Sequence, residues 1–93
     1  MKLSKHAKLK IEERRIDLEN IEKVLKNAEL IFYDIISKSF VSIGKIKIGE
    51  METNLIVVHK KEDDEIKIIT AYPCKNIDKE IKRKERLKWI RIK

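Results

Sequence analysis

The sequence predicts a small α+β domain with two N-terminal helices, a four-stranded, mainly antiparallel sheet and one C-terminal basic helix. Three observations predict this fold class. Apolar residues recur at helical spacing early in the chain, short β-rich runs separated by turn residues fill the middle, and cations dominate residues 79–93. A length of 93 residues with 42% apolar content suits one domain over residues 1–93, which should bury roughly 60–65% of the surface of its unfolded chain.

Two linked helices are expected at the start of the chain. Ser4 has the side chain of an N-cap before a helix over residues 5–15, and Asp17 is a second candidate N-cap before a helix that ends near Asn27. The thin apolar side of the first helix consists of Leu3, Ala7 and Ile11. The fuller apolar side of the second consists of Leu18, Ile21, Val24, Leu25 and Ala28.

Four β-rich runs follow, at residues 30–33, 40–48, 54–59 and 65–72. Apolar positions in the second run change from odd to even numbers across Gly44-Lys45, which predicts a bulge or tight bend there. The third run is apolar on both faces and is expected to be a central strand. Charged residues form the turn before the fourth run, which should end at Pro73 because proline cannot donate a ladder hydrogen bond.

A basic helix or tail is expected over residues 79–93. Asp78 is a candidate N-cap for a helix that runs to about Lys88. A basic stripe at spacing i, i+3, i+4, i+7 consists of Lys79, Lys82, Arg83 and Arg86. The pattern of residues 89–92 fits two alternatives, a fraying helix end and a short edge strand.

The formal net charge of +7 is concentrated at the two ends of the chain. Residues 1–16 carry a net charge of +4 and residues 79–93 a net charge of +6, whereas the middle carries −3. This asymmetry favours a polyanionic partner, either a phosphodiester backbone or a negatively charged protein segment. The alternative is that lysine-rich ends only keep a thermophilic protein soluble, since Lys and Glu enrichment is typical of hyperthermophile proteins.

Several classes of site are excluded by the residues present. A single cysteine, Cys74, excludes an internal disulfide and a cysteine-based zinc cluster. The acidic run 62–65 lacks the glycine and the ligand spacing of a calcium loop, so no metal and no cofactor are expected. No apolar run reaches the ~20 residues of a membrane span and no signal-peptide pattern is visible, which predicts no membrane partner and a cytoplasmic location.

Several short motifs resemble domain-of-unknown-function family 4258. They are Ser4-Lys5-His6-Ala7, Glu13-Arg14-Arg15-Ile16, Val24-Leu25-Lys26-Asn27 and Ile69-Thr70-Ala71-Tyr72-Pro73. The resemblance covers residues 3–73, and Arg15 stands where the family often has Gly. That family is similar to the RelE/ParE and BrnT toxins, small α+β domains of toxin–antitoxin pairs, several of which cleave RNA. The resemblance therefore implies a RelE-like fold and an RNA-binding or RNA-cleaving module with an antitoxin-like partner.

Four residues are candidates for metal-independent cleavage of RNA, which needs a base, a stabiliser of phosphorane charge and an acid. His6 is the candidate base or acid, because an imidazole titrates near neutral pH. Arg14 is the candidate phosphate clamp. Thr70 and Tyr72 lie one residue apart on a strand, so both side chains share one sheet face and are candidates for donating to phosphate or stacking on a base. The four groups converge only if the first helix lies against the last strand.

Each candidate also has a structural interpretation. His6 suits a helix surface, Arg14 suits pairing with an acidic residue, and Thr70 and Tyr72 suit packing in a strand. The candidates for nucleic-acid binding are Lys10, Arg15, Lys79, Lys82, Arg83 and Arg86. Three functions stay open: a toxin-like RNA-interacting domain with or without ribonuclease activity, a non-catalytic nucleic-acid-binding module, and a domain that receives an acidic antitoxin-like protein.

Overall fold

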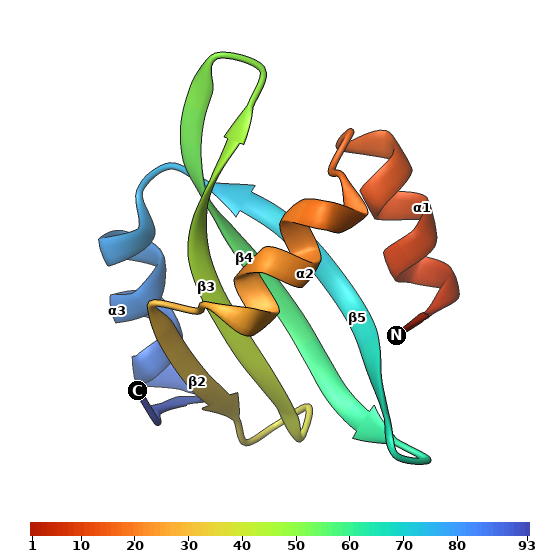
Figure 1. The fold of residues 1–93 in the computed structure, drawn as a ribbon. Helices are drawn as coiled ribbons and strands as arrows, with labels where there is room; N and C mark the ends of the chain where they lie inside the picture. The colour runs from red at the N-terminus through yellow and green to blue at the C-terminus, as the bar shows by residue number, and fades with distance from the viewer.

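The fold is built on one six-stranded mixed sheet, seen in a computed structural model that describes all of residues 1–93 (Figure 1). In chain order the elements are β1 (Lys2–Leu3), α1 (Lys5–Glu13), α2 (Leu18–Lys26), β2 (Leu30–Asp34), β3 (Ser39–Ile48), β4 (Met51–Glu62), β5 (Glu65–Cys74), α3 (Ile77–Leu87) and β6 (Trp89–Arg91). The strand order across the sheet is β1-β5-β4-β3-β2-β6.

The predicted four-stranded, mainly antiparallel sheet after two N-terminal helices is wrong. A strand precedes the helices, because β1 pairs in parallel with β5 through Lys2 and Lys67, and this pairing makes the sheet mixed. At the other edge β6 pairs antiparallel with β2, so residues 89–91 form an edge strand rather than a helix end. Strands of two and three residues are too short to show a period of two, and their pairing depends on distant parts of the chain.

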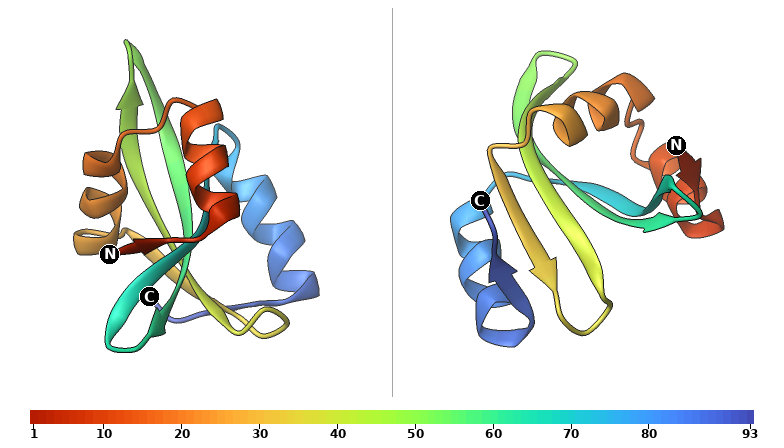
Figure 2. Two further views of the ribbon diagram at one scale, coloured as in Figure 1. Left: turned by 90° about the vertical axis from the view of Figure 1, so that its right-hand side faces the viewer. Right: turned by 60° about the horizontal axis from the view of Figure 1, so that its bottom comes forward.

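Helices cover both faces of the sheet (Figure 2). We call these the α1/α2 face and the α3 face. The core of the α1/α2 face consists of Ala7, Ile11, Ile16, Ile21, Val24, Ile46, Leu55, Val57, Ile68 and Ala71. The core of the α3 face consists of Phe32, Val41, Ile43, Ile56 and Trp89, with Ile77 and Ile81 of α3 packed against it. No helix is both long and apolar enough to cross a membrane.

Of the bulge or tight bend predicted at Gly44-Lys45, the bulge is absent, because β3 pairs with β4 without interruption from Phe40 to Ile48. Ile43 belongs to the core of the α3 face and Ile46 to that of the α1/α2 face. The apolar positions therefore change from odd to even numbers because different helices cover the two faces of β3. Gly44 allows the close approach of α2, since a Cβ atom there would lie 3.3 Å from Cγ2 of Val24. The observed irregularity lies in the β4–β5 pairing, beside Val58.

Local signals at the helix ends are partly as expected. The Ser4 hydroxyl caps α1 by accepting a hydrogen bond from Ala7 N at 3.0 Å. Arg15, between α1 and α2, adopts a φ of 54°, the left-handed conformation for which glycine is the usual residue. For α3 the N-cap is Asn76, whose side chain accepts from Lys79 N, so the assignment of this cap to Asp78 is wrong.

Candidate nucleic-acid interface

The four predicted cations of the last helix gather on one exposed side of α3. This helix packs Ile77 and Ile81 toward the sheet, and the i, i+3, i+4, i+7 spacing turns the cations the opposite way. A shallow, open hollow is lined there by Asn76, Asp78, Lys79, Lys82, Arg83 and Arg86. We call Lys79, Lys82, Arg83 and Arg86 the basic face of α3.

Three of these cations have no ion-pair partner, whereas Arg83 is paired. Its Nη2 lies 2.7 Å from Oε1 of Glu80, and its Nε donates to the same oxygen at 3.2 Å. Burial alone would raise the pKa of Glu80, but the hydrogen bond and charge of Arg83 hold that pKa below its usual value. Glu80 is therefore ionised at neutral pH, and the charge available to a polyanion comes mainly from Lys79, Lys82 and Arg86.

Glu80 also accepts a hydrogen bond from the hydroxyl of Tyr72, at 3.3 Å from Oε2. Tyr72 lies on the α3 face, opposite Ile56 in the β4–β5 register. Burial, and secondly the charge of Glu80, raise the pKa of the Tyr72 phenol well above its usual value. At neutral pH the hydroxyl therefore stays protonated and committed to Glu80.

Arg14 reaches the same tyrosine from the other helix layer. Its Nη1 donates to the carbonyl oxygen of Ala71 at 2.7 Å, and its Cζ lies 5.9 Å from the centroid of the Tyr72 ring. Ala71 points into the core of the α1/α2 face while Tyr72 points to the α3 face, so Arg14 passes around the outer edge of β5. Contacts therefore run from Arg14 to Tyr72, from Tyr72 to Glu80 and from Glu80 to Arg83, and they link α1 to α3 around the outer edge of β5.

The first helix does lie against the last strand of the β4–β5 hairpin, the arrangement on which the predicted site depends. Ser4 donates from Oγ to the carbonyl oxygen of Ile69 at 3.0 Å, and Figure 1 shows α1 beside β5. Of the four catalytic candidates, this contact brings Arg14 and Tyr72 together. His6 is exposed on α1 and makes no hydrogen bond or ion pair, and Thr70 is half-buried with no side-chain hydrogen bond.

Helix geometry explains why His6 stands apart from Arg14. Eight residues at a rise of 1.5 Å separate their backbones by about 12 Å along the helix axis. The i, i+4, i+8 spacing also drifts around the helix by about 80°, because 3.6 residues make a turn. Lys10, between them, pairs with Glu13 at 3.3 Å, and Arg15 is exposed beyond the helix end. The catalytic roles of the four candidates stay predictions.

Glu80 is the residue of this region that the sequence interpretation missed. The i, i+3 spacing of Glu80 and Arg83 was a visible signal for their ion pair. The contact with Tyr72 was not visible, because it depends on how α3 packs on β5.

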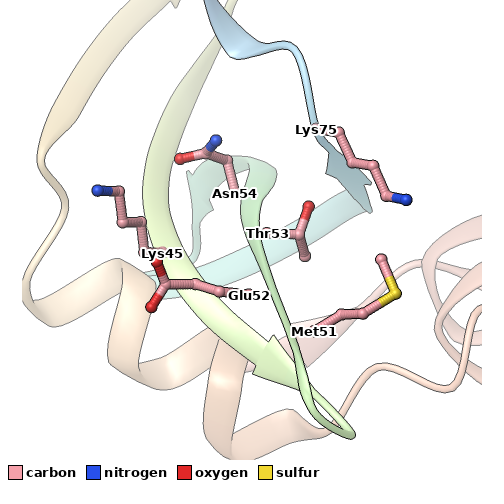
Figure 3. Close-up of a pocket in the computed structure, with 6 residues that line it drawn as sticks. All are labelled: Lys45, Met51, Glu52, Thr53, Asn54 and Lys75. Carbon is pink, nitrogen blue, oxygen red and sulfur yellow. The ribbon is translucent and has the colours of Figure 1, made fainter.

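A second open hollow lies at the β3–β4 hairpin and is lined by Lys45, Met51, Glu52, Thr53, Asn54 and Lys75 (Figure 3). The hydroxyl of Thr53 is buried there without a hydrogen-bond partner. Figure 3 shows Lys45 and Lys75 on opposite sides of β4, so the two cations do not converge on one point. No group of three or more His, Cys, Asp or Glu side chains is arranged to hold a metal ion.

Comparison with known proteins gives one match. The family model described as domain of unknown function (DUF4258) matches residues 3–73, which is most of the chain. No curated protein and no solved structure matches. The matched range runs from β1 through β5 and includes Arg14 and Tyr72, whereas the basic face of α3 lies beyond it. The chain belongs to the DUF4258 family.

Proposed function

We propose that this protein is an RNA-interacting domain that holds the RNA backbone on the basic face of α3. The observation that carries the proposal is the gathering of four cations around one open hollow whose lining holds one acid, Asp78, while Glu80 beside it pairs with Arg83 alone. The phosphates of a flexible strand are spaced closely enough to contact cations that lie one helical turn apart. When Lys or Arg neutralises a phosphate, the counterions of that phosphate are released, and this release supplies affinity. The uneven distribution of the net charge of +7 supports the same partner.

Binding at this surface is expected to be insensitive to base sequence. Recognition of single-stranded bases needs exposed rings or paired donors and acceptors. The aromatic ring nearest the basic face, that of Tyr72, has Arg14 over it and its hydroxyl bound to Glu80. The surface therefore offers charge without a free stacking platform.

Salt-dependent RNA binding tests the proposal. In K79Q/K82Q the negative slope of log affinity against log salt should become shallower by about two units, because each lysine accounts for about one phosphate contact. A matched control is K23Q/K26Q, which removes the same charge from the exposed end of α2. Equal binding by wild type and K79Q/K82Q, or an equal loss in both double variants, would refute the assignment of the basic face.

The resemblance to the RelE/ParE and BrnT toxins supports extending the proposal to a toxin-like domain, and a cytoplasmic location accords with it. In that extension Arg14 clamps a phosphate and His6 transfers a proton, with Thr70 and Tyr72 as donors. Incubation of labelled RNA with wild type and H6A in the presence of a chelator tests it. Cleavage that H6A abolishes would support a metal-independent endoribonuclease, whereas bound but intact RNA would limit the activity to binding.

An acidic antitoxin-like protein is the competing ligand for the basic face. Such a protein should form a stoichiometric complex at moderate salt. RNA held through its phosphates should bind much more weakly at the same salt concentration. Competition between the RNA and a polyglutamate peptide for wild-type protein at two salt concentrations separates the two. Displacement of RNA that persists at the higher salt would favour the protein ligand.

A further inference from the structure

An apolar and aromatic row crosses the α1/α2 face of the sheet where no helix covers it. Residues paired directly across neighbouring strands share one face, and the register aligns Ile90, Tyr33, Phe40, His59 and Ile68. Ile68 lies fully buried in the core beneath α1. Toward the opposite edge the row emerges, since Phe40 is 40% exposed and Ile90 is 55% exposed.

The row is an ordered surface rather than a loose collection of side chains. The rings of Tyr33 and Phe40 meet edge to face with centroids 5.1 Å apart, and Phe40 stacks against His59 at 6.1 Å. Nε2 of His59 lies 2.8 Å from Oγ of the buried Ser42, which fixes the imidazole. In Figure 1, α2 crosses the middle of β3 and β4 and leaves the lower part of these strands and β2 open on this side.

Exposed isoleucines enlarge this surface at its end. Ile35 and Ile36 lie in the turn between β2 and β3, and both are at least half exposed. Ile92 follows β6 and its backbone N–H donates to the carbonyl oxygen of Ile31. Exposed apolar side chains gathered at one end of a small domain favour an interaction site there. From here on, the apolar row means the exposed part of the aligned row, Ile90, Tyr33, Phe40 and His59, together with Ile35 and Ile36 of the neighbouring turn.

The charged strand residue on the open part of the α1/α2 face is a cation. Alternation along the paired strands places every acidic residue of β2 to β5 either on the α3 face or in a turn. On the α1/α2 face the charged strand residue is Lys61, two positions beyond His59, and Lys38 lies in the turn before Phe40. The last turn of α2 adds Lys23 and Lys26, with Glu22 beside them on the same helix. The cations on the sheet surface and in the turn before Phe40 favour a partner with an apolar centre and acidic flanks.

We propose that the apolar row is a docking surface for an amphipathic, acidic segment of a partner protein. A second copy of this chain fits poorly, because it would bring a charge of +7 against cations of the same sign. RNA fits less well, because the rings of Tyr33, Phe40 and His59 already contact one another and the most exposed side chains of the row are isoleucines. The basic face of α3 also lies on the opposite side of the sheet. This inference is independent of RNA binding by α3.

The test uses a designed helical peptide of about 18 residues, or five turns. It carries Leu at i, i+3, i+4, i+7 and Glu elsewhere, and its twin carries Lys in place of Glu. Titration of isotope-labelled protein should shift the backbone amide signals of Tyr33, Phe40 and Ile90 with the acidic peptide and not with its twin. F40S and I90S should each weaken binding about tenfold, as expected for a central contact.

The matched control is L9S, which removes an equally exposed leucine from α1. It should leave peptide affinity unchanged, and thermal melts of all three variants show whether each is folded. Several results would overturn the inference: no binding of the acidic peptide, shifts confined to α3, or equal binding of the basic twin. An oligouridylate that shifts Tyr33 and Phe40 would assign the surface to RNA, and self-association that F40S abolishes would assign it to a second copy. If the basic face of α3 is the RNA site, F40S should bind RNA as strongly as wild type does.

Discussion

Asp34 holds the turn between β2 and β3 in place, and its removal is expected to destabilise the whole domain. The side chain is almost fully buried on the α3 face. Its Oδ1 accepts hydrogen bonds from Ile36 N and Ser37 N, both at 3.0 Å. Its Oδ2 lies 3.2 Å from Nζ of Lys88, which precedes β6. One carboxylate therefore joins a turn to the edge strand that follows α3.

The size of the effect follows from these three contacts. Each hydrogen bond to a charged acceptor contributes about 1.5–3 kcal/mol, and because the donors belong to an exposed turn we take about 3 kcal/mol for the two. The partly exposed ion pair with Lys88 adds about 0.5 kcal/mol. D34A should thus lower the free energy of unfolding by about 3.5 kcal/mol, which corresponds to a fall in Tm of about 14–28 °C. D34N keeps an acceptor for the turn and should lose about half as much.

The pH dependence provides a second, independent readout. Burial alone would raise the pKa of Asp34, but the turn N–H groups and Lys88 hold that pKa below its usual value. The stabilisation is therefore complete above the unfolded value of about 3.9 and is lost as the pH falls through the lower folded value. Thermal melts of wild type and D34N between pH 7 and pH 2 should converge at the acid end. A D34A cost below about 1 kcal/mol, or a gap that is constant with pH, would refute this account.

Substitutions at three further positions test other parts of the structure by urea unfolding. G44A should cost about 1 kcal/mol and G44V about 3 kcal/mol, because the added atoms press on Val24; a G44V as stable as wild type would show that α2 can move away. R14Q should cost about 1.5–2 kcal/mol through the lost hydrogen bond to Ala71 and the lost contact with Tyr72, and should leave RNA binding by the basic face of α3 intact. If folded R14Q lost RNA binding, Arg14 would belong to the interface. Burial lowers the pKa of His59, so the unfolded chain binds more protons and wild type should lose stability from pH 7 to pH 5. H59Q should lack most of this fall, and an unchanged fall would show that another group titrates.

Those parts of the molecule that depend on neighbours in sequence could be predicted. The cap at Ser4 and the basic stripe of α3 follow from residues three or four positions apart, and both are present in the structure. In each of these cases the physical cause lies within one or two helical turns.

Those parts that depend on long-range pairing could not be predicted. The parallel contact of β1 with β5 joins residues more than sixty positions apart, and a strand of two residues has no pattern of its own. At Gly44 the pattern was real but was attributed to a bulge or bend, because the sequence does not show that helices cover both faces of this uninterrupted strand. The Tyr72–Glu80 hydrogen bond was missed for the same reason, since it forms only when α3 docks on β5.

The stacking of Trp89 on Phe32, with ring centroids 5.1 Å apart, has a practical consequence for anyone who wishes to express this domain. The family pattern stops at residue 73, but the tryptophan that shields Phe32 and the strand that closes the edge of β2 come later. A polypeptide trimmed to the family limits would expose that phenylalanine to water and offer an unprotected sheet edge to its neighbours. The unit that folds is longer than the unit that the family pattern describes, and expression boundaries should extend through Arg91.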